Sequence, residues 1–241
     1  MGGKQGRRRQ DHLARRAQSE GYHARSVYKL QAIQRKFRVL PARGDTTGRA
    51  PGRGSDAAGR ALGPGVLDLG AAPGSWTQFV VEHMGRDASP GGSGSAPAVL
   101  AVDLQELDLP GAICLQGDFT EPETAMRIRA HAPFRVVLSD AAPATTGNRV
   151  VDTGRSEVLV ESILAHLPEW LAPGGNLVCK LFQGGGEQAL LGSLRARFSA
   201  AHLHRPEAVR RESFETYLVG LGYHGPGEPA RNGAASSGGN Q

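Results

Sequence analysis

The stretch "VLDLGAAPGSW", residues 66–76, decides the fold. It is a short apolar run that contains one acid and then breaks into a turn rich in glycine and proline. This pattern is typical of a buried strand that feeds a ligand-binding loop. The turn holds "AAP" where the dinucleotide fingerprint G-x-G-x-x-G has closely spaced glycines. Gly70 and Gly74 still permit a ligand to approach the backbone closely. The loop therefore favours a nucleoside without phosphates.

Apolar strand-like runs alternate with helical patterns along the rest of the chain. The expected strands lie at 66–70, 98–104, 112–118, 135–140 and 176–182. The helices that accompany them are expected at 76–84, 122–132, 153–171 and 187–198. A further helix is expected at 26–37, with Ser26 as its N-cap. This alternation predicts a parallel sheet covered by helices on both faces, with ligands at the carboxyl ends of the strands.

Two more strand-like runs, at 200–205 and 215–223, follow the last of these helices. The segment between them is too short for the crossover that parallel strands need, so the last strand should run antiparallel to its neighbour. Its first residue, Glu215, then lies at the rim where the ligand loops gather. The expected fold class is α/β, with a mostly parallel seven-stranded sheet, an antiparallel last strand and helices on both faces.

Glycine and proline mark the expected boundaries of the folded domain. The chain of 241 residues contains 34 glycines and 15 prolines, and many of them gather in segments poor in large apolar side chains. We expect one domain at 26–223, with loop insertions at 41–65 and 85–97. A basic N-terminal arm at 1–25, partly disordered, should precede the domain, and a disordered tail at 224–241 should follow it.

Positive charge is concentrated at the start of the chain. The chain has a formal net charge of +5, and residues 1–36 hold ten Lys and Arg against two acids, a net +8. A solvated helix face explains most such runs, but the same charge suits a nucleic-acid-binding arm. Charge alone favours the second reading only slightly.

Hydropathy and cysteine content indicate the compartment. No apolar run approaches the roughly twenty residues of a membrane span, and no signal peptide is recognisable. We therefore expect a cytoplasmic protein without membrane contact. Cys114 and Cys179 lie in apolar runs, which favours two buried free thiols over a disulfide or a metal site. No metal is expected.

Acidic residues end two successive strand-like runs. Asp103 stands in "AVDL" and Asp118 in "QGDF". Carboxylates at the carboxyl ends of strands accept hydrogen bonds from ribose hydroxyls and from an exocyclic amine. A single such Asp is as readily a helix N-cap or a turn carboxylate. Two of them on one sheet favour a nucleoside ligand, and S-adenosylmethionine is such a ligand.

Four ionisable residues occupy positions that folding alone does not explain. Asp140 ends "RVVLSD", and Lys180 interrupts the apolar run "LVCKLF". Glu215 opens the last strand, and Lys29 falls on the rim of the apolar stripe of the helix at 26–37. A buried lysine is costly unless it is paired, so Lys180 forms a structural ion pair with Asp140 or has a function. Its place in a cleft favours a function.

Several motifs together resemble those of a known family. In order along the chain they are "RSVYKL", "DLGAAPGSWTQ", "AVDL", "QGDF", "SDAAP", "LAPGGNLVCKLFQG" and "RRESFETYLVG". Their order and spacing are similar to those of the FtsJ/RrmJ-type methyltransferases, which modify a ribose 2′-hydroxyl of RNA. The resemblance runs from about residue 11 to residue 223. It departs at Ser75, where glycine is common, and after Pro143, where asparagine is often found.

The resemblance implies a Rossmann-like fold that uses S-adenosylmethionine. The catalytic set that it implies is Lys29, Asp140, Lys180 and Glu215. The cofactor contacts that it implies are Gly74, Trp76, Asp103, Asp118 and Asp140. The chain looks like the bacterial large-subunit branch of this family, whose enzyme methylates a uridine in the A loop of 23S rRNA within the assembled large ribosomal subunit. We expect a monomer.

Methyl transfer from a sulfonium needs an oxygen nucleophile that is held in line and partly deprotonated. We expect Lys180 to accept the proton of the 2′-hydroxyl, because burial in the strand and the charge of Lys29 both favour the neutral amine. Asp140 and Glu215 oppose this but orient the amine. A role for Lys180 as a positioning cation stays open.

Three alternatives follow from the same residues. A tRNA or an mRNA cap is the alternative substrate. Few aromatic residues lie outside the apolar runs, however, and a cap would need such residues to stack on. A non-catalytic RNA-binding ribosome-assembly factor would use the same arm and fold without needing the four charged residues. A nicotinamide oxidoreductase is disfavoured, because it should carry G-x-G-x-x-G.

Overall fold

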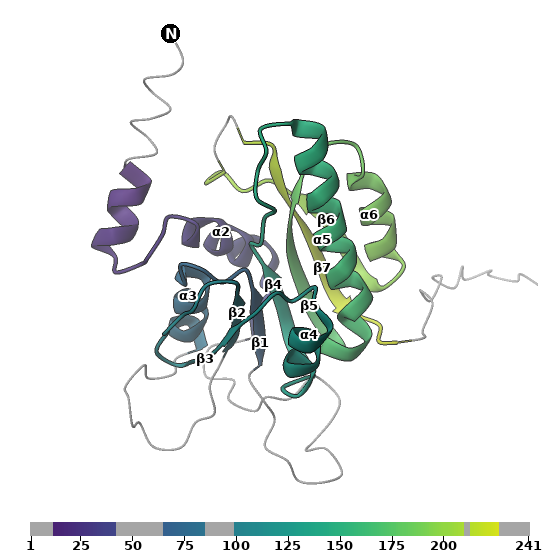
Figure 1. The fold of residues 1–241 in the computed structure, drawn as a ribbon, viewed down its shortest axis with the longest axis horizontal. Helices are drawn as coiled ribbons and strands as arrows, with labels where there is room; N and C mark the ends of the chain where they lie inside the picture. The colour runs from purple at the N-terminus through teal and green to yellow at the C-terminus, as the bar shows by residue number, and fades with distance from the viewer. Residues whose placement is uncertain (1–11, 42–64, 85–98, 210–212, 227–241) are drawn as a thin grey trace, which may run out of the picture.

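The computed structural model describes residues 12–41, 65–84, 99–209 and 213–226. These residues form one seven-stranded sheet with helices against it (Figure 1). The strands are β1 (Val66–Leu69), β2 (Val99–Asp103), β3 (Ala112–Gln116), β4 (Phe134–Ser139), β5 (Leu171–Phe182), β6 (Phe198–His204) and β7 (Glu215–Tyr223). The helices are α2 (Val27–Phe37), α3 (Ser75–Met84), α4 (Pro122–Arg129), α5 (Arg149–Trp170) and α6 (Glu187–Arg195), and residues 12–19 form another.

The sheet order is β3-β2-β1-β4-β5-β7-β6. Neighbours among the first five strands pair parallel, whereas β7 pairs antiparallel with both β5 and β6. Phe182 at the end of β5 lies opposite Glu215 at the start of β7. The predicted fold class is confirmed, including the antiparallel last strand and the position of Glu215 at the carboxyl rim.

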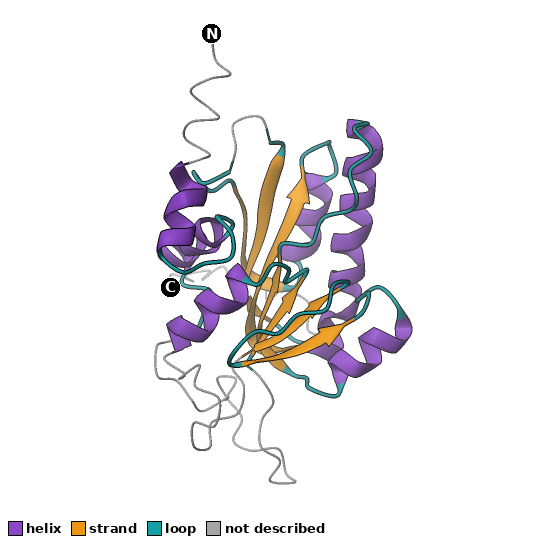
Figure 2. Ribbon diagram, turned by 60° about the vertical axis from the view of Figure 1, so that its left-hand side comes forward, coloured by secondary structure: helices purple, strands orange, loops and turns teal. Residues whose placement is uncertain are grey.

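Helices cover both faces of the sheet (Figure 2). An apolar layer lies between the helices and the sheet on each face. Ile33 of α2 and Val80 of α3 pack with Val136 on one face, and Leu164 of α5 packs with Val137 on the other. Adjacent residues of a strand point to opposite faces, so the continuous apolar run of β4 supplies both layers. The predicted cover of helices on both faces is therefore confirmed.

Several local details differ from the sequence-based expectations. Ser26 precedes α2, but its backbone is helical and its side chain makes no cap hydrogen bond. The α5 helix begins earlier than expected, because the Asn148 side chain accepts hydrogen bonds from the backbone N–H groups of Val150 and Val151. The β5 strand also begins earlier, at Leu171, and a register shift against β4 absorbs the extra residues.

Part of the N-terminal arm is folded. The helix over residues 12–19 buries Ala17 against Val27 and Tyr28, so this part of the arm belongs to the packed structure. Nearly all of the predicted insertions and tail lie outside the described residues. No helix within the described segments is long and apolar enough to cross a membrane. Both cysteines are free, but only Cys179 is buried, because Cys114 lies on the outermost strand β3.

Candidate active site

Four charged side chains meet at the carboxyl rim of the sheet. Lys29 Nζ lies 2.8 Å from Glu215 Oε1 and 3.8 Å from Asp140 Oδ1. Lys180 Nζ lies 3.3 Å from Asp140 Oδ1 and also donates a hydrogen bond to the Asp140 backbone carbonyl. These side chains are only 10% to 17% exposed. Their charges are therefore screened weakly by water, yet a substrate can still reach them.

Each member of this cluster comes from a different element. Asp140 follows β4, Lys180 lies near the end of β5, Glu215 begins β7 and Lys29 projects from α2. Parallel β4 and β5 end at the same rim, and β7 begins there because it is antiparallel. The structure thus brings together all four residues that the resemblance assigned to a catalytic set.

Tyr217 joins this cluster, and sequence reasoning missed it. Its hydroxyl donates a hydrogen bond to Asp140 Oδ1 at 2.8 Å. Burial, and then the charge of Asp140, raise the pKa of the Tyr217 phenol well above its usual value, so the hydroxyl remains a donor. Glu215 and Tyr217 stand two residues apart on one strand and therefore face the same side of the sheet. That alternation in "ETY" was the available signal.

A cavity of about 960 Å³ adjoins the cluster. Loops after β1, β2, β3 and β4 line it, and its polar lining includes Asp103, Asp118 and Asp140. Asp103 accepts hydrogen bonds from the backbone N–H groups of Ala72 and Gln105, both at 2.9 Å. Each Asp103 oxygen keeps acceptor capacity beyond these bonds.

Asp118 also makes local contacts at the cavity. Its Oδ1 accepts hydrogen bonds from the Thr120 backbone N–H at 2.9 Å and from the Thr120 hydroxyl at 2.7 Å. Both predicted acids therefore organise their own loops while lining the cavity. The turn-carboxylate reading and the ligand-binding reading are compatible at these positions.

The residues that line the cavity suit a nucleoside. Gly70 has a φ of 71°, and a Cβ there would lie 2.6 Å from the Ala141 Cα, so only glycine lets these two loops approach. On the α5 side the lining includes Val150 and Val158, whose exposures of 81% and 62% are high for apolar side chains. An apolar wall opposite carboxylates suits a purine ring and its ribose. Within the described segments, no group of three or more His, Cys, Asp or Glu is placed to hold a metal.

The other two predicted cofactor residues, Gly74 and Trp76, are not among those that line the cavity. Trp76 is buried, and its Nε1 donates to the Ser26 carbonyl at 2.9 Å. Gly74 has a φ of 107°, and a Cβ there would lie 2.5 Å from Leu109. The Ser75 hydroxyl lies 2.7 Å from the Ser26 hydroxyl. This region therefore fastens the glycine loop to the start of α2, the helix that carries Lys29.

The comparisons with known proteins agree with this geometry. Residues 22–223 match the family described as FtsJ-like methyltransferase. The chain belongs to this family. The resemblance found in the motifs is thereby confirmed, and the protein is a methyltransferase with a Rossmann-like fold.

Curated relatives of this FtsJ-like methyltransferase cover most of its length. A Treponema denticola protein named ribosomal RNA large subunit methyltransferase E is 39% identical, over 89% of this chain and 96% of its own. A Syntrophobacter fumaroxidans protein of the same name is 41% identical, over 88% and 94%. Among solved structures, a ribosomal RNA methyltransferase from Plasmodium falciparum has a TM-score of 0.64 at 22% identity, covering 85% of this chain and all of the other. At that identity the likeness supports the fold alone.

Proposed function

We propose that this methyltransferase transfers a methyl group from S-adenosylmethionine to a ribose 2′-hydroxyl of RNA. The proposed target is a uridine in the A loop of 23S rRNA within the large ribosomal subunit. The observation that carries the proposal is that Lys29, Asp140, Lys180 and Glu215 meet beside a cavity of about 960 Å³ lined by carboxylates. The names of the curated relatives support ribosomal RNA as the substrate.

The residues proposed to hold the cofactor are Gly74, Trp76, Asp103, Asp118 and Asp140. Asp103 and Asp118 would accept hydrogen bonds from the ribose hydroxyls and from the adenine amine, and Val150 and Val158 would contact the ring. Gly74 and Trp76 would act by shaping the glycine loop. When bound, S-adenosylmethionine supplies an electrophilic methyl group on a cationic sulfur.

The chain's own residues would position the hydroxyl and move its proton. Lys180 Nζ would take the proton of the 2′-hydroxyl as a base, while its hydrogen bond to the Asp140 carbonyl fixes the direction of the amine. Glu215 holds the Lys29 ammonium at 2.8 Å, which places a second positive charge at the same rim. The Lys29 ammonium, joined by the Lys180 ammonium once Lys180 has taken the proton, would stabilise the negative charge that develops on the oxygen nucleophile.

The finer parts of the proposal concern setting and assembly. We propose that the protein acts in the cytoplasm as a monomer, without a metal ion and without membrane contact. Light scattering of the full chain with and without S-adenosylmethionine would measure its mass in solution. A stable dimer would contradict the monomer.

Mapping of 2′-O-methyl groups on total RNA tests the function. A strain that lacks the protein should lose the methyl group on one uridine of the 23S rRNA A loop. The wild-type gene should restore it and a gene encoding Lys180→Met should not. Loss of methylation in tRNA or at an mRNA cap instead would favour the alternative substrates. Unchanged methylation together with defective subunit assembly would favour a non-catalytic assembly factor.

A further inference from the structure

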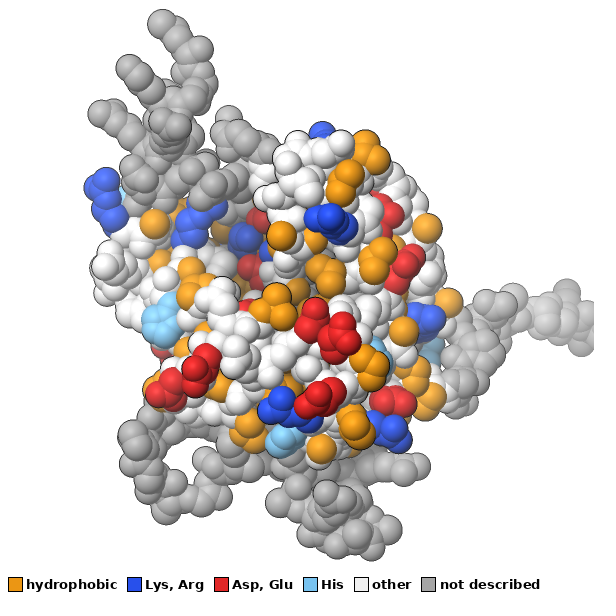
Figure 3. All heavy atoms as spheres, viewed as in Figure 1, with side chains coloured by type: hydrophobic (Ala, Val, Ile, Leu, Met, Phe, Trp, Pro, Cys, Tyr) orange, Lys and Arg blue, Asp and Glu red, His pale blue; other side chains and the backbone are white. Residues whose placement is uncertain are grey.

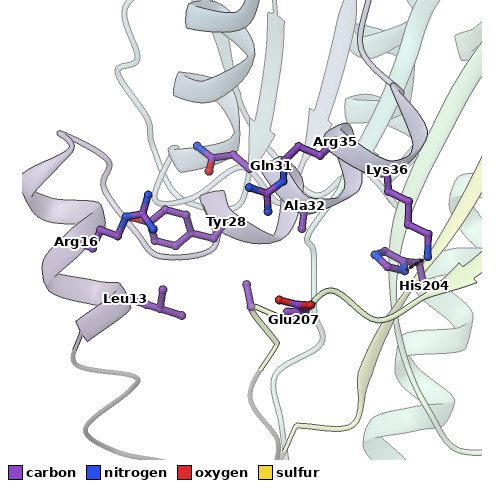
Figure 4. Close-up of a pocket in the computed structure, with 10 residues that line it drawn as sticks. Leu13, Arg16, Tyr28, Gln31, Ala32, Arg35, Lys36, His204 and Glu207 are labelled. Carbon is purple, nitrogen blue, oxygen red and sulfur yellow. Dashed lines mark hydrogen bonds between the residues drawn. The ribbon is translucent and has the colours of Figure 1, made fainter.

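A second cavity, of about 490 Å³, lies on the outer side of α2 (Figure 4). Three parts of the chain build it: the helix at residues 12–19, one side of α2, and the end of β6 with the loop that follows. It shares no lining residue with the 960 Å³ cavity. We call it the α2 groove, and neither the catalytic cluster nor the proposed cofactor site accounts for it.

The floor of the α2 groove combines small apolar side chains with Gln31 and the edge of the buried Tyr28, and its rim is basic. Tyr28 and Ala32 stand one helical turn apart on α2, and Leu13 and Ala208 approach them from the other two elements. The Arg16 guanidinium lies 5.1 Å from the centre of the Tyr28 ring at one end. Apolar surface framed by cations is the arrangement that single-stranded nucleic acid uses, because its sugars and bases need the floor and its phosphates need the rim.

The positive charge of the groove is greatest at the C-terminal end of α2. Arg35 and Lys36 are exposed there, whereas Arg16 is paired with Glu20 at 2.7 Å. Glu207 is the one acid among the described residues that line the groove, and it lies across from α2 (Figure 4). On the face seen in Figure 3, several basic side chains lie in the upper part, on the side of the N-terminal helices, and others lie among acidic side chains lower down.

His204 also lines the groove and contacts Lys36, with Nδ1 3.4 Å from Lys36 Nζ. Burial, and then the charge of Lys36, lower the pKa of His204 below its usual value. At neutral pH His204 is therefore an uncharged hydrogen-bonding group. Arg35 and Lys36 carry the charge that an anion would meet.

The α2 side of the groove leads directly into the catalytic cluster. Tyr28 faces the groove, and the next residue, Lys29, reaches Glu215 and Asp140. The stripe from Tyr28 to Lys36 spans about 12 Å along the helix axis, comparable with about three steps of a stacked strand at 3.4 Å each. A ribose held at the catalytic cluster would thus have neighbouring nucleotides within reach of the groove.

We propose that the α2 groove binds the phosphodiester backbone of the RNA beside the target nucleotide, with Arg35 and Lys36 contacting phosphates. This inference rests on the proposed function, because it takes RNA as the substrate. It adds a binding surface that the catalytic cluster and the cofactor cavity do not contain.

A matched pair of double variants tests the inference in the full chain. Arg35→Gln with Lys36→Gln removes the two cations of the last turn of α2, and Arg127→Gln with Arg129→Gln removes two from the last turn of α4 on the opposite face. A short fluorescent oligouridylate is titrated at low and at moderate salt. The α2 variant should bind about tenfold more weakly at low salt, and its salt slope should fall by about 1.4, since each single-strand phosphate contact contributes about 0.7. The α4 variant should bind like the wild type.

Further measurements separate this inference from the proposed function. Affinity for S-adenosylmethionine and the melting temperature should match between the two double variants. If the α2 double variant does not fold, the single variants at exposed Arg35 and Lys36 replace it. Equal oligouridylate binding by both double variants would overturn the proposal that the α2 groove binds RNA, even if the wild type methylates large subunits. The opposite result is also informative. If the wild type methylates no ribosomal RNA but the α2 variant selectively loses oligouridylate binding, RNA binding by the groove is supported and the proposed function is contradicted.

Discussion

Lys180 and Tyr217 are cross-strand partners in the antiparallel pair β5 and β7, and their polar atoms meet on one oxygen, Asp140 Oδ1. The tyrosine hydroxyl is 2.8 Å from that oxygen and the lysine amine is 3.3 Å from it. Asp140 is thus held between the Tyr217 hydroxyl and the Lys180 amine. The orientation of Lys180 therefore depends on the register of β7 as well as on its position in β5.

Tyr217→Phe tests this dependence. The substitution removes the hydrogen bond to Asp140 but keeps the ring, whose centre lies 5.9 Å from that of Trp76. We expect the fold and S-adenosylmethionine binding to persist and kcat to fall about tenfold, the lower end for a lost hydrogen bond to a charged group. Single-turnover methyl transfer to large subunits measures it. Tyr223→Phe, on the same strand but outside the cluster, is the control. An equal effect of both variants would show that Tyr217 only fills space.

Lys180→Met separates a base from a structural partner. A purely structural ion pair should tolerate an apolar replacement of similar length, and methylation should continue. If Lys180 is the proton acceptor, the Lys180→Met protein should fold and bind S-adenosylmethionine, but its single-turnover rate should be lower by at least about 10²-fold. The assay is tritiated-methyl transfer to large subunits from a strain lacking the enzyme. Near-normal turnover would remove Lys180 as base, and with it the supporting roles of Lys29 and Glu215.

Asp103→Ala tests the cofactor cavity. The substitution removes a carboxylate that lines the cavity and holds the Ala72 N–H. Affinity for S-adenosylmethionine should fall by about 1 to 3 kcal/mol, the range for polar groups left without partners. Calorimetry measures it. Asp108→Ala, an exposed position in the same connection, is the control. Unchanged affinity in Asp103→Ala would place the ligand elsewhere.

We expect Asp68 to make the stability of the protein depend on pH. It is fully buried in β1, its Oδ2 accepts a hydrogen bond from the Thr77 hydroxyl at 2.7 Å, and burial raises its pKa to about 7. The unfolded chain releases this proton near pH 3.9, so between about pH 4 and pH 7 the folded state binds more protons. The free energy of unfolding should therefore fall as pH rises through that window, by up to about 4 kcal/mol.

Asp68→Asn should flatten this dependence, because the amide does not titrate and its oxygen can still accept from Thr77. Urea unfolding at several pH values between 5 and about 7.5 measures it. Asp152→Asn is the comparison. The hydrogen bond from the Thr146 backbone N–H lowers the pKa of Asp152, so the contribution of Asp152 to the free energy of unfolding disappears only below about pH 4. Asp152→Asn should therefore not change the slope of the free energy of unfolding against pH in the measured window. An Asp68→Asn protein with the wild-type slope would contradict the assignment.

The sequence by itself determined the architecture and the charged set. The alternation of apolar runs and helical patterns implied a parallel sheet, and the short link before residue 215 required an antiparallel last strand. These are local consequences of strand and helix periodicity and of the length that a crossover needs. Lys180 was visible because a charge inside an apolar strand is costly enough to need a reason.

Only the tertiary structure decided which side chains meet. The bond between Tyr217 and Asp140, the contact between the Ser26 and Ser75 hydroxyls and the α2 groove join residues that are far apart in the chain. Such contacts depend on strand register and on how helices rest on the sheet, and a shift of one residue would turn Tyr217 to the opposite face. Local sequence patterns carry the periodicity of each element, whereas the distances between elements arise from packing.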